Sequence, residues 1–176
     1  NAQTKVLHDE WIQANNIIAE LDYLTSEVRL QQYAHVISDT RTEFEIHEAE
    51  IEGLLEQING LMADYEKTIN TDIDRQYYEA AGEAWTRYLR ATGEEFYDLS
   101  RAMKLDEANA IMLGEGYDAF IDFQENFDAL LAFNHEGAEE ASEHATTVFI
   151  VVCIMVIVLV AVAAITALRI AKMIIE

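Results

Sequence analysis

The feature that most constrains this chain is an uninterrupted apolar stretch near its C-terminus. Residues 145–168 read ATTVFIVVCIMVIVLVAVAAITAL and carry no charge over 24 residues. As a helix this stretch would be roughly 36 Å long, enough to cross a bilayer core of about 30 Å with some tilt. A buried core helix is the alternative, but apolarity on every side over this length favours a membrane span. The stretch is not a secretory signal, because it lies at the C-terminus and has no small-residue cleavage pattern.

The charges on either side of this stretch predict its direction. Arg169 and Lys172 follow it, whereas three glutamates precede it within residues 139–143. Because positive residues stay on the cytoplasmic side of a membrane, we expect the C-terminus in the cytoplasm and residues 1–144 outside. The chain starts without Met and stops eight residues after the stretch. We therefore expect a piece of a longer protein, whose N-terminal part holds a signal or a first span.

Charge is distributed very unevenly along the chain. Residues 1–144 hold 9 Lys and Arg against 32 Asp and Glu, a formal charge of −23, while residues 145–176 hold two cations and one anion. Such an acidic domain is a poor partner for nucleic acid or anionic lipid, since neither would release counterions onto it. The single cysteine, Cys153, falls inside the apolar stretch. Packing alone must then hold the outer domain together, without an internal disulfide.

Apolar residues recur at three- and four-residue spacing from end to end, which predicts helix throughout. There is no Pro, there are only 7 Gly, and three polar breaks divide the chain. At the first, Thr40 and Glu43 form a capping-box pattern. The others lie at 70–72 and 104–106, where Asp106 can cap the next helix. The four helices predicted between these breaks span residues 2–37, 41–69, 72–103 and 106–144.

Each predicted helix carries one apolar seam. The seam of the first helix runs from Leu7 to His35. The seam of the third helix ends at Met103, and the seam of the last helix begins at Leu113. Four amphipathic helices with short connections predict an all-α fold, an antiparallel up-down-up-down four-helix bundle. The last helix continues into the apolar stretch without a breaker, so both ends of the bundle would lie at the membrane.

This layout resembles a known family. The resemblance is carried by AWTRYLR at 84–90, EEFYDLS at 94–100 and LLAFNHEG at 130–137. The chain resembles the extracytoplasmic four-helix-bundle sensor of methyl-accepting chemotaxis receptors, with their second transmembrane helix. The resemblance implies a homodimer in the bacterial inner membrane, with residues 1–144 as a periplasmic ligand-sensing domain and 169–176 as the start of a cytoplasmic linker before a HAMP-type region. Such sensors also front histidine kinases and cyclic-dinucleotide enzymes, so those outputs stay open.

Polar residues near the seam of the first helix are candidates for ligand binding, because burying them costs free energy unless they are paired. The candidates are Thr25, Arg29, Gln32, Tyr33 and His35. In the resembled receptors a small ligand sits in this distal half, between the first helices of a dimer and the fourth helix, where arginines grip its carboxylate. Arg29 is the only Arg in this stretch, and an ion pair with Glu27 or another carboxylate is its alternative role.

A second group of candidates comes from the later helices. Its members are Trp85, Tyr88, Thr92, Phe96, Tyr117 and Gln124. Aromatic walls with a few polar groups suit a small organic ligand, although core packing is the alternative. Arg87 and Arg90 could form a carboxylate fork, but both lie roughly 130° or more from the seam centre at 100° per residue, which favours exposure or an inter-subunit contact. We predict a small organic anion, a carboxylate or an aromatic acid, as the ligand.

Catalysis and metal binding find little support in the sequence. A di-iron bundle needs Glu-x-x-His pairs, and none of the five histidines follows a Glu at that spacing. There is no haem-attachment motif and no Gly-rich phosphate loop, and Ser100 has no His nearby in sequence. We expect no enzyme, no cofactor and no resident metal. A membrane-anchored protein-interaction bundle without a small ligand is the remaining alternative.

For the homodimer that the resemblance implies, Arg29, Tyr33 and Val36 are our candidates for the interface. Two parallel domains of charge −23 repel each other, so we expect association to strengthen with added salt.

Overall fold

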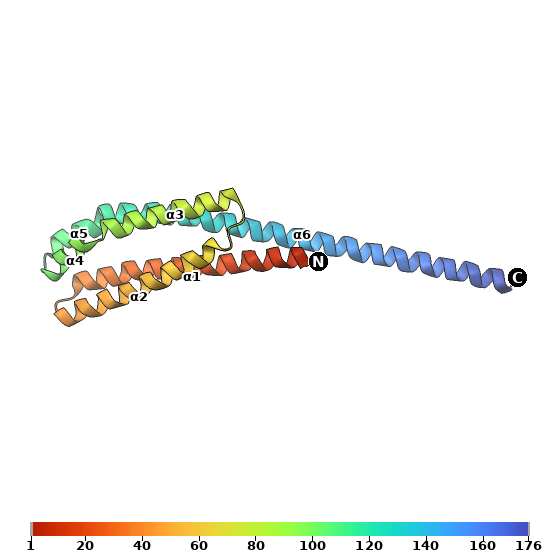
Figure 1. Ribbon diagram of the computed structural model, residues 1–176, viewed down its shortest axis with the longest axis horizontal. Coiled ribbons are helices and arrows are strands. Elements are labelled where there is room, and N and C mark those ends of the chain that lie inside the picture. Colours follow the sequence, from red (N-terminus) through yellow and green to blue (C-terminus); the bar gives the residue numbers. More distant parts are fainter. Residues whose placement is uncertain (1, 176) are drawn as a thin grey trace.

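The structure, a computed structural model, describes the backbone of residues 2–175 and the side chains of 11–140, 142–143, 146–163 and 165. Within this part the chain forms six helices and no strand. These are α1 (Ala2–Ile37), α2 (Arg41–Glu66), α3 (Asp72–Ala91), α4 (Glu94–Arg101), α5 (Leu105–Leu113) and α6 (Glu115–Ile175). Figure 1 shows α1 and α2 as one antiparallel pair beside a second pair formed by α3 and α6. The predicted all-α four-helix bundle is confirmed.

Helix starts follow the local sequence. The Thr40 hydroxyl accepts the backbone N–H of Glu43, and the Glu43 carboxylate accepts the backbone N–H of Thr40, which completes the predicted capping box of α2. At the start of α3 the Thr71 hydroxyl accepts the backbone N–H of Asp74, a side-chain cap without the reciprocal bond of a capping box. The predicted cap at Asp106 is wrong, because α5 already begins at Leu105. The second helix also ends earlier than predicted, at Glu66.

Two of the four predicted helices are interrupted near their distal ends. The third breaks at Thr92 and Gly93, between α3 and α4, and the fourth breaks at Gly114, between α5 and α6. A Cβ at Gly114 would lie 2.7 Å from the carbonyl oxygen of Ala110, so the chain can turn this closely only with glycine. Short helices α4 and α5 therefore form the tip of the bundle, far from both termini in Figure 1.

The break at Gly114 changes which residues of the fourth helix face inward. Leu113 and Tyr117 were expected on the seam, but their side chains are 65% and 47% exposed. Met112 is buried in their place, and Met103 at the end of the third predicted helix is exposed as well. From Phe120 onward the predicted register returns in part. Phe120, Phe127 and Asn134 are buried as expected, but Leu131 is 37% exposed and Leu130 is buried in its place.

Helix α6 connects the bundle to the apolar stretch. It contains 61 residues, about 90 Å of continuous helix at 1.5 Å per residue. Its segment Thr146–Ala163 has a mean hydropathy of 3.1, and no part of it is buried within the chain. By length and composition this segment can cross a membrane. A displacement of the bundle part of α6 would reach it through uninterrupted backbone hydrogen bonds.

Candidate ligand-binding site in the distal half of the bundle

The guanidinium of Arg29 lies among aromatic rings. Its Cζ atom is 4.6–5.8 Å from four ring centres, those of Tyr33, Tyr88, Tyr117 and Phe120. Nη2 donates hydrogen bonds to the Tyr33 hydroxyl at 3.0 Å and to the Met112 carbonyl at 3.4 Å. Nη1 is buried without a hydrogen-bond partner among the described residues. We call Arg29 and these four rings the Arg29 cage.

The Arg29 cage holds a positive charge without a carboxylate. The alternative ion pair with Glu27 is not formed, since the Glu27 carboxylate accepts a hydrogen bond from Gln31 instead. No described Asp or Glu lies within ion-pair distance of Arg29. Cation–π contacts stabilise the guanidinium by about 0.5–2 kcal/mol, but a buried N–H without an acceptor costs about 1–3 kcal/mol. An anion with a carboxylate oxygen would satisfy that donor.

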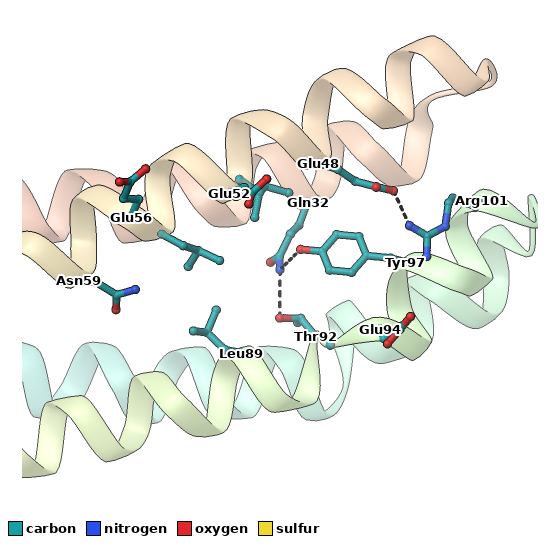
Figure 2. A pocket seen from close by; sticks show the side chains of 13 residues that line it. Gln32, Glu48, Glu52, Glu56, Asn59, Leu89, Thr92, Glu94, Tyr97 and Arg101 are labelled. Carbon is teal, nitrogen blue, oxygen red and sulfur yellow. Dashed lines mark hydrogen bonds and ion pairs between the residues drawn. The ribbon is translucent and has the colours of Figure 1, made fainter.

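Gln32 connects the Arg29 cage to the other side of α1. Its side chain is only 1% exposed, its Oε1 accepts the Tyr88 hydroxyl, and its Nε2 donates to Thr92 Oγ1 at 3.0 Å and to the Tyr97 hydroxyl at 3.1 Å. Figure 2 shows Gln32 between Thr92 and Tyr97. Burial raises the pKa of Tyr88 and of Tyr97, so both hydroxyls stay neutral. Because Tyr88 belongs to the cage and to this network, the two are mechanically linked.

The remaining predicted site residues lie elsewhere in the bundle. Thr25 is buried and donates within its own helix, to the carbonyl of Leu21 at 2.9 Å. Trp85 is a core residue that stacks on Tyr88 and packs against Phe123. Gln124 is half-buried on α6 and makes no hydrogen bond with the cage among the described residues. The structure thus brings Arg29, Gln32, Tyr33, Tyr88, Thr92 and Tyr117 together through direct contacts.

Arg87 and Arg90 are both exposed on α3, as the helical geometry predicted. Arg87 forms an ion pair with Asp122 of α6, which ties α3 to α6 on the surface. The two arginines make no fork in this arrangement.

A buried network at the tip was not predicted. His35 is fully buried, with Nδ1 2.8 Å from the Ser100 hydroxyl and Nε2 3.0 Å from the Glu48 carboxylate, which also accepts Arg101 Nη1 at 2.6 Å. Burial lowers the pKa of His35, although Glu48 opposes the shift. Ser100 is fully buried and also donates to the His35 carbonyl at 3.1 Å. The network therefore pins α1 to α2 and α4, and no substrate can reach the hydroxyl.

His35 and Ser100 are 65 positions apart in the sequence. Their places on the amphipathic helices are the only sequence signal that could have indicated this contact. The buried polar state of Thr25, Gln32 and His35, however, follows the seam that the sequence defined.

Comparison with known proteins identifies the class of this bundle. A family profile described as "Four helix bundle sensory module for signal transduction" matches residues 1–149. The chain belongs to this family of chemotaxis-receptor sensors, which confirms the resemblance seen in the sequence. It is 21% identical over 147 residues to YvaQ of Bacillus subtilis (strain 168), a protein named as a sensory transducer. The match covers 84% of this chain and 26% of YvaQ, so the chain spans about a quarter of that relative's length.

Proposed function

We propose that this chain is the sensor of a transmembrane chemoreceptor that binds a small organic anion, a carboxylate or an aromatic acid, at the Arg29 cage. In this proposal residues 1–144 lie outside the cell membrane, in the periplasm where one exists, residues 145–168 span it, and residues 169–176 begin the cytoplasmic linker. The observation that carries the proposal is the half-buried Arg29 guanidinium, with aromatic neighbours, no carboxylate partner and an unpaired Nη1.

Several contacts favour an anion at this place. The positive charge and the free N–H attract a carboxylate oxygen, and the hydrogen bond of a guanidinium to a carboxylate is among the stronger ones in proteins. The exposed ring of Tyr117 forms part of the cage surface that solvent reaches. An aromatic acid could stack on this ring while its carboxylate meets Arg29.

In this proposal the signal is transmitted by α6, which supplies two of the four rings of the Arg29 cage. Tyr117 and Phe120 belong to α6, which continues without a break through Thr146–Ala163. A ligand that binds two arrangements of the bundle with different affinity shifts their populations, and only by that difference. Packed helices favour small discrete displacements, so the proposed output is a shift of α6 relative to α1.

A homodimer is supported by a second, unpartnered seam on α1. Tyr23, Leu30 and Ile37 follow one another at seven-residue spacing and are 63%, 58% and 83% exposed. A heptad stripe of apolar residues on an exposed helix face suits a parallel helix–helix interface. Val36 was also expected at the interface, but it is buried in its own bundle beside Phe96, because it lies on the inward seam.

The experiment that tests the ligand site uses the 176-residue chain in lipid nanodiscs. Thermal melting is recorded with benzoate, succinate, malate and a panel of amino acids at millimolar concentration. A ligand at 100 times its Kd stabilises the folded state by about 2.7 kcal/mol, or several degrees in Tm for a chain of this size. We expect at least one carboxylate to raise Tm, and the rise to vanish in Arg29→Ala.

Two control variants locate the effect. Arg75→Ala removes an exposed arginine that pairs with Glu66 at 3.5 Å, far along the bundle, and should keep the full response. Arg90→Ala tests the alternative arginine pair on α3. A response that survives Arg29→Ala, or the absence of any response to the panel, would refute the proposed site. The second outcome would favour a protein-interaction bundle.

A further inference from the structure

A groove separates α2 from α3 and α4 in the distal half of the bundle (Figure 2). Its cavity volume is about 790 Å³. Helix α2 packs mainly on α1, and α3 packs mainly on α6. The two pairs are joined through α1 and α6, whereas α2 and α3 face each other with few contacts. Near Tyr65 and Tyr78 the seam is closed, because these rings stack and the Tyr78 hydroxyl donates to the Met62 carbonyl at 3.2 Å. Toward the tip the ion pair between Glu48 and Arg101, at 2.6 Å, joins α2 to α4, and the groove lies between this ion pair and the stacked rings.

The walls of the groove combine carboxylates with aliphatic side chains. Its aliphatic surface comes from Ile51, Leu55 and Leu89, and its four acids are Glu48, Glu52, Glu56 and Glu94. Arg101 is the one cationic lining residue, and it is already paired with Glu48 and with Asp98, at 2.6 and 2.8 Å. Among the described residues, Glu52, Glu56 and Glu94 have no ion-pair partner. The groove therefore carries an uncompensated negative charge above an apolar surface.

We propose that this groove binds an aliphatic diamine or polyamine. Glu52 and Glu56 are one helical turn apart on α2, about 6 Å along the helix axis, and Glu94 faces the groove from the start of α4. Ammonium groups spaced along a flexible chain can meet these separate carboxylates, while the methylene groups between them cover the aliphatic surface. Asn59 adds an amide at the end of the groove nearer the membrane.

Two observations discriminate against other ligands. The described residues contain no group of three or more His, Cys, Asp or Glu side chains arranged to hold one metal ion. The acids of the groove are thus spread out, which suits a cation whose charges are also spread out. A carboxylate ligand would meet repulsion from three unpaired acids, so this site and its ligand class are independent of the anion site proposed at Arg29.

A bound polyamine would also bridge the two halves of the bundle. Glu52 and Glu56 belong to the pair formed by α1 and α2, and Glu94 belongs to α4 on the other side. Gln32 and Tyr97 lie in the same groove, and Gln32 is hydrogen-bonded to Tyr88 of the Arg29 cage. Occupancy of the groove would hold α2 against α4 next to that network.

The proposal is tested by isothermal titration calorimetry with 1,4-diaminobutane and spermidine. The sample is the 176-residue chain in nanodiscs of zwitterionic lipid at about 0.15 M salt. The groove variant is Glu52→Gln/Glu56→Gln. The matched control is Glu136→Gln/Glu140→Gln, which removes the same charge from two exposed acids at the same spacing on α6. We expect binding of both amines, at least tenfold weaker binding to the groove variant, and a change of less than twofold in the control. Thermal melting of both variants verifies that they are folded.

Three outcomes would overturn the proposal. The first is no binding heat with either amine at millimolar concentration. The second is an equal loss of affinity in the groove variant and the control, because the formal charge of −22 would then attract amines without a site. The third is that magnesium chloride displaces the diamine as completely as spermidine does at equal ionic strength. This result would indicate that the diamine is held only by screened, non-specific electrostatic attraction.

Discussion

Gly137→Ala should destabilise the bundle, although the same change usually stabilises a helix. A Cβ at Gly137 would lie 2.5–2.8 Å from three ring atoms of Trp11, where α1 meets α6. Ordinary contact begins near 3.4 Å, so the indole must retreat by almost 1 Å. Trp11 also packs edge-on against Phe133, at 5.8 Å between ring centres, and the retreat disturbs that pair.

The two opposing free-energy terms can be compared. Replacing Gly by Ala inside a helix gains about 1 kcal/mol from backbone propensity. Overpacking of a filled contact costs about 1–3 kcal/mol, and loss of an aromatic pair costs about 0.5–1.5 kcal/mol. We therefore expect a net loss of about 1–2 kcal/mol, which lowers Tm by roughly 2–8 °C for a chain of this size.

Gly60→Ala is the matched control. Gly60 lies inside α2, and a Cβ there would meet nothing within 4 Å. This variant should raise Tm by about 2–4 °C. The assay is thermal melting of the chain in nanodiscs, followed by circular dichroism at 222 nm. In a Trp11→Ala background the Gly137→Ala change should become stabilising, because the obstruction is gone. Equal stabilisation by Gly137→Ala and Gly60→Ala in the wild-type background would refute the reasoning.

Three further predictions concern the buried polar groups. Burial raises the pKa of Asp74, so the folded protein holds this proton more tightly than the unfolded chain, and its ionisation reduces stability as pH rises through the raised pKa. Asp74→Asn should therefore be at least as stable as wild type at pH 7, and any advantage should be lost near pH 4. A marked loss of stability of this variant at pH 7 in melting experiments would contradict the reasoning. Burial lowers the pKa of His35, so stability should fall as pH drops below about 6.5; His35→Gln should melt with a smaller difference between pH 7.5 and 5.5, and an unchanged difference would count against the assignment. Tyr88→Phe leaves Gln32 Oε1 without its donor and should cost about 1–3 kcal/mol, whereas Tyr23→Phe, whose side chain is exposed, should change Tm little.

Much of the fold could be predicted because its signals are local. The capping box at Thr40 depends on two residues three positions apart, and the inward seam of α1 depends on helical spacing alone. Both are confirmed. The breaks at Gly93 and Gly114 were missed because a single Gly inside a helical pattern is weak evidence for a helix end. Packing of the short helices α4 and α5 at the tip of the bundle is what ends a helix at Gly93 and at Gly114.

The candidate site was predicted less completely. Helical spacing identified Arg29 and Gln32 as polar residues near a seam, and the sequence could not tell whether Arg29 pairs with a carboxylate or with aromatic rings. The inward placement of Tyr117 was wrong because the register of the fourth helix changes at Gly114. The acidic groove was missed because its walls come from α2 on one side and from α3 and α4 on the other, at least 30 residues apart in the chain.

The sequence by itself determined that this chain is helical, that its last helix continues into a stretch able to span a membrane, and which face of α1, α2 and α3 turns inward. Hydropathy and its period decide these properties, and they act within a few turns of one helix. Tertiary structure decided what surrounds Arg29, that His35 meets Ser100, and that a groove opens between α2 and the segment formed by α3 and α4. These depend on which side chains from distant segments share a small volume, and close packing settles that only once all helices are in place.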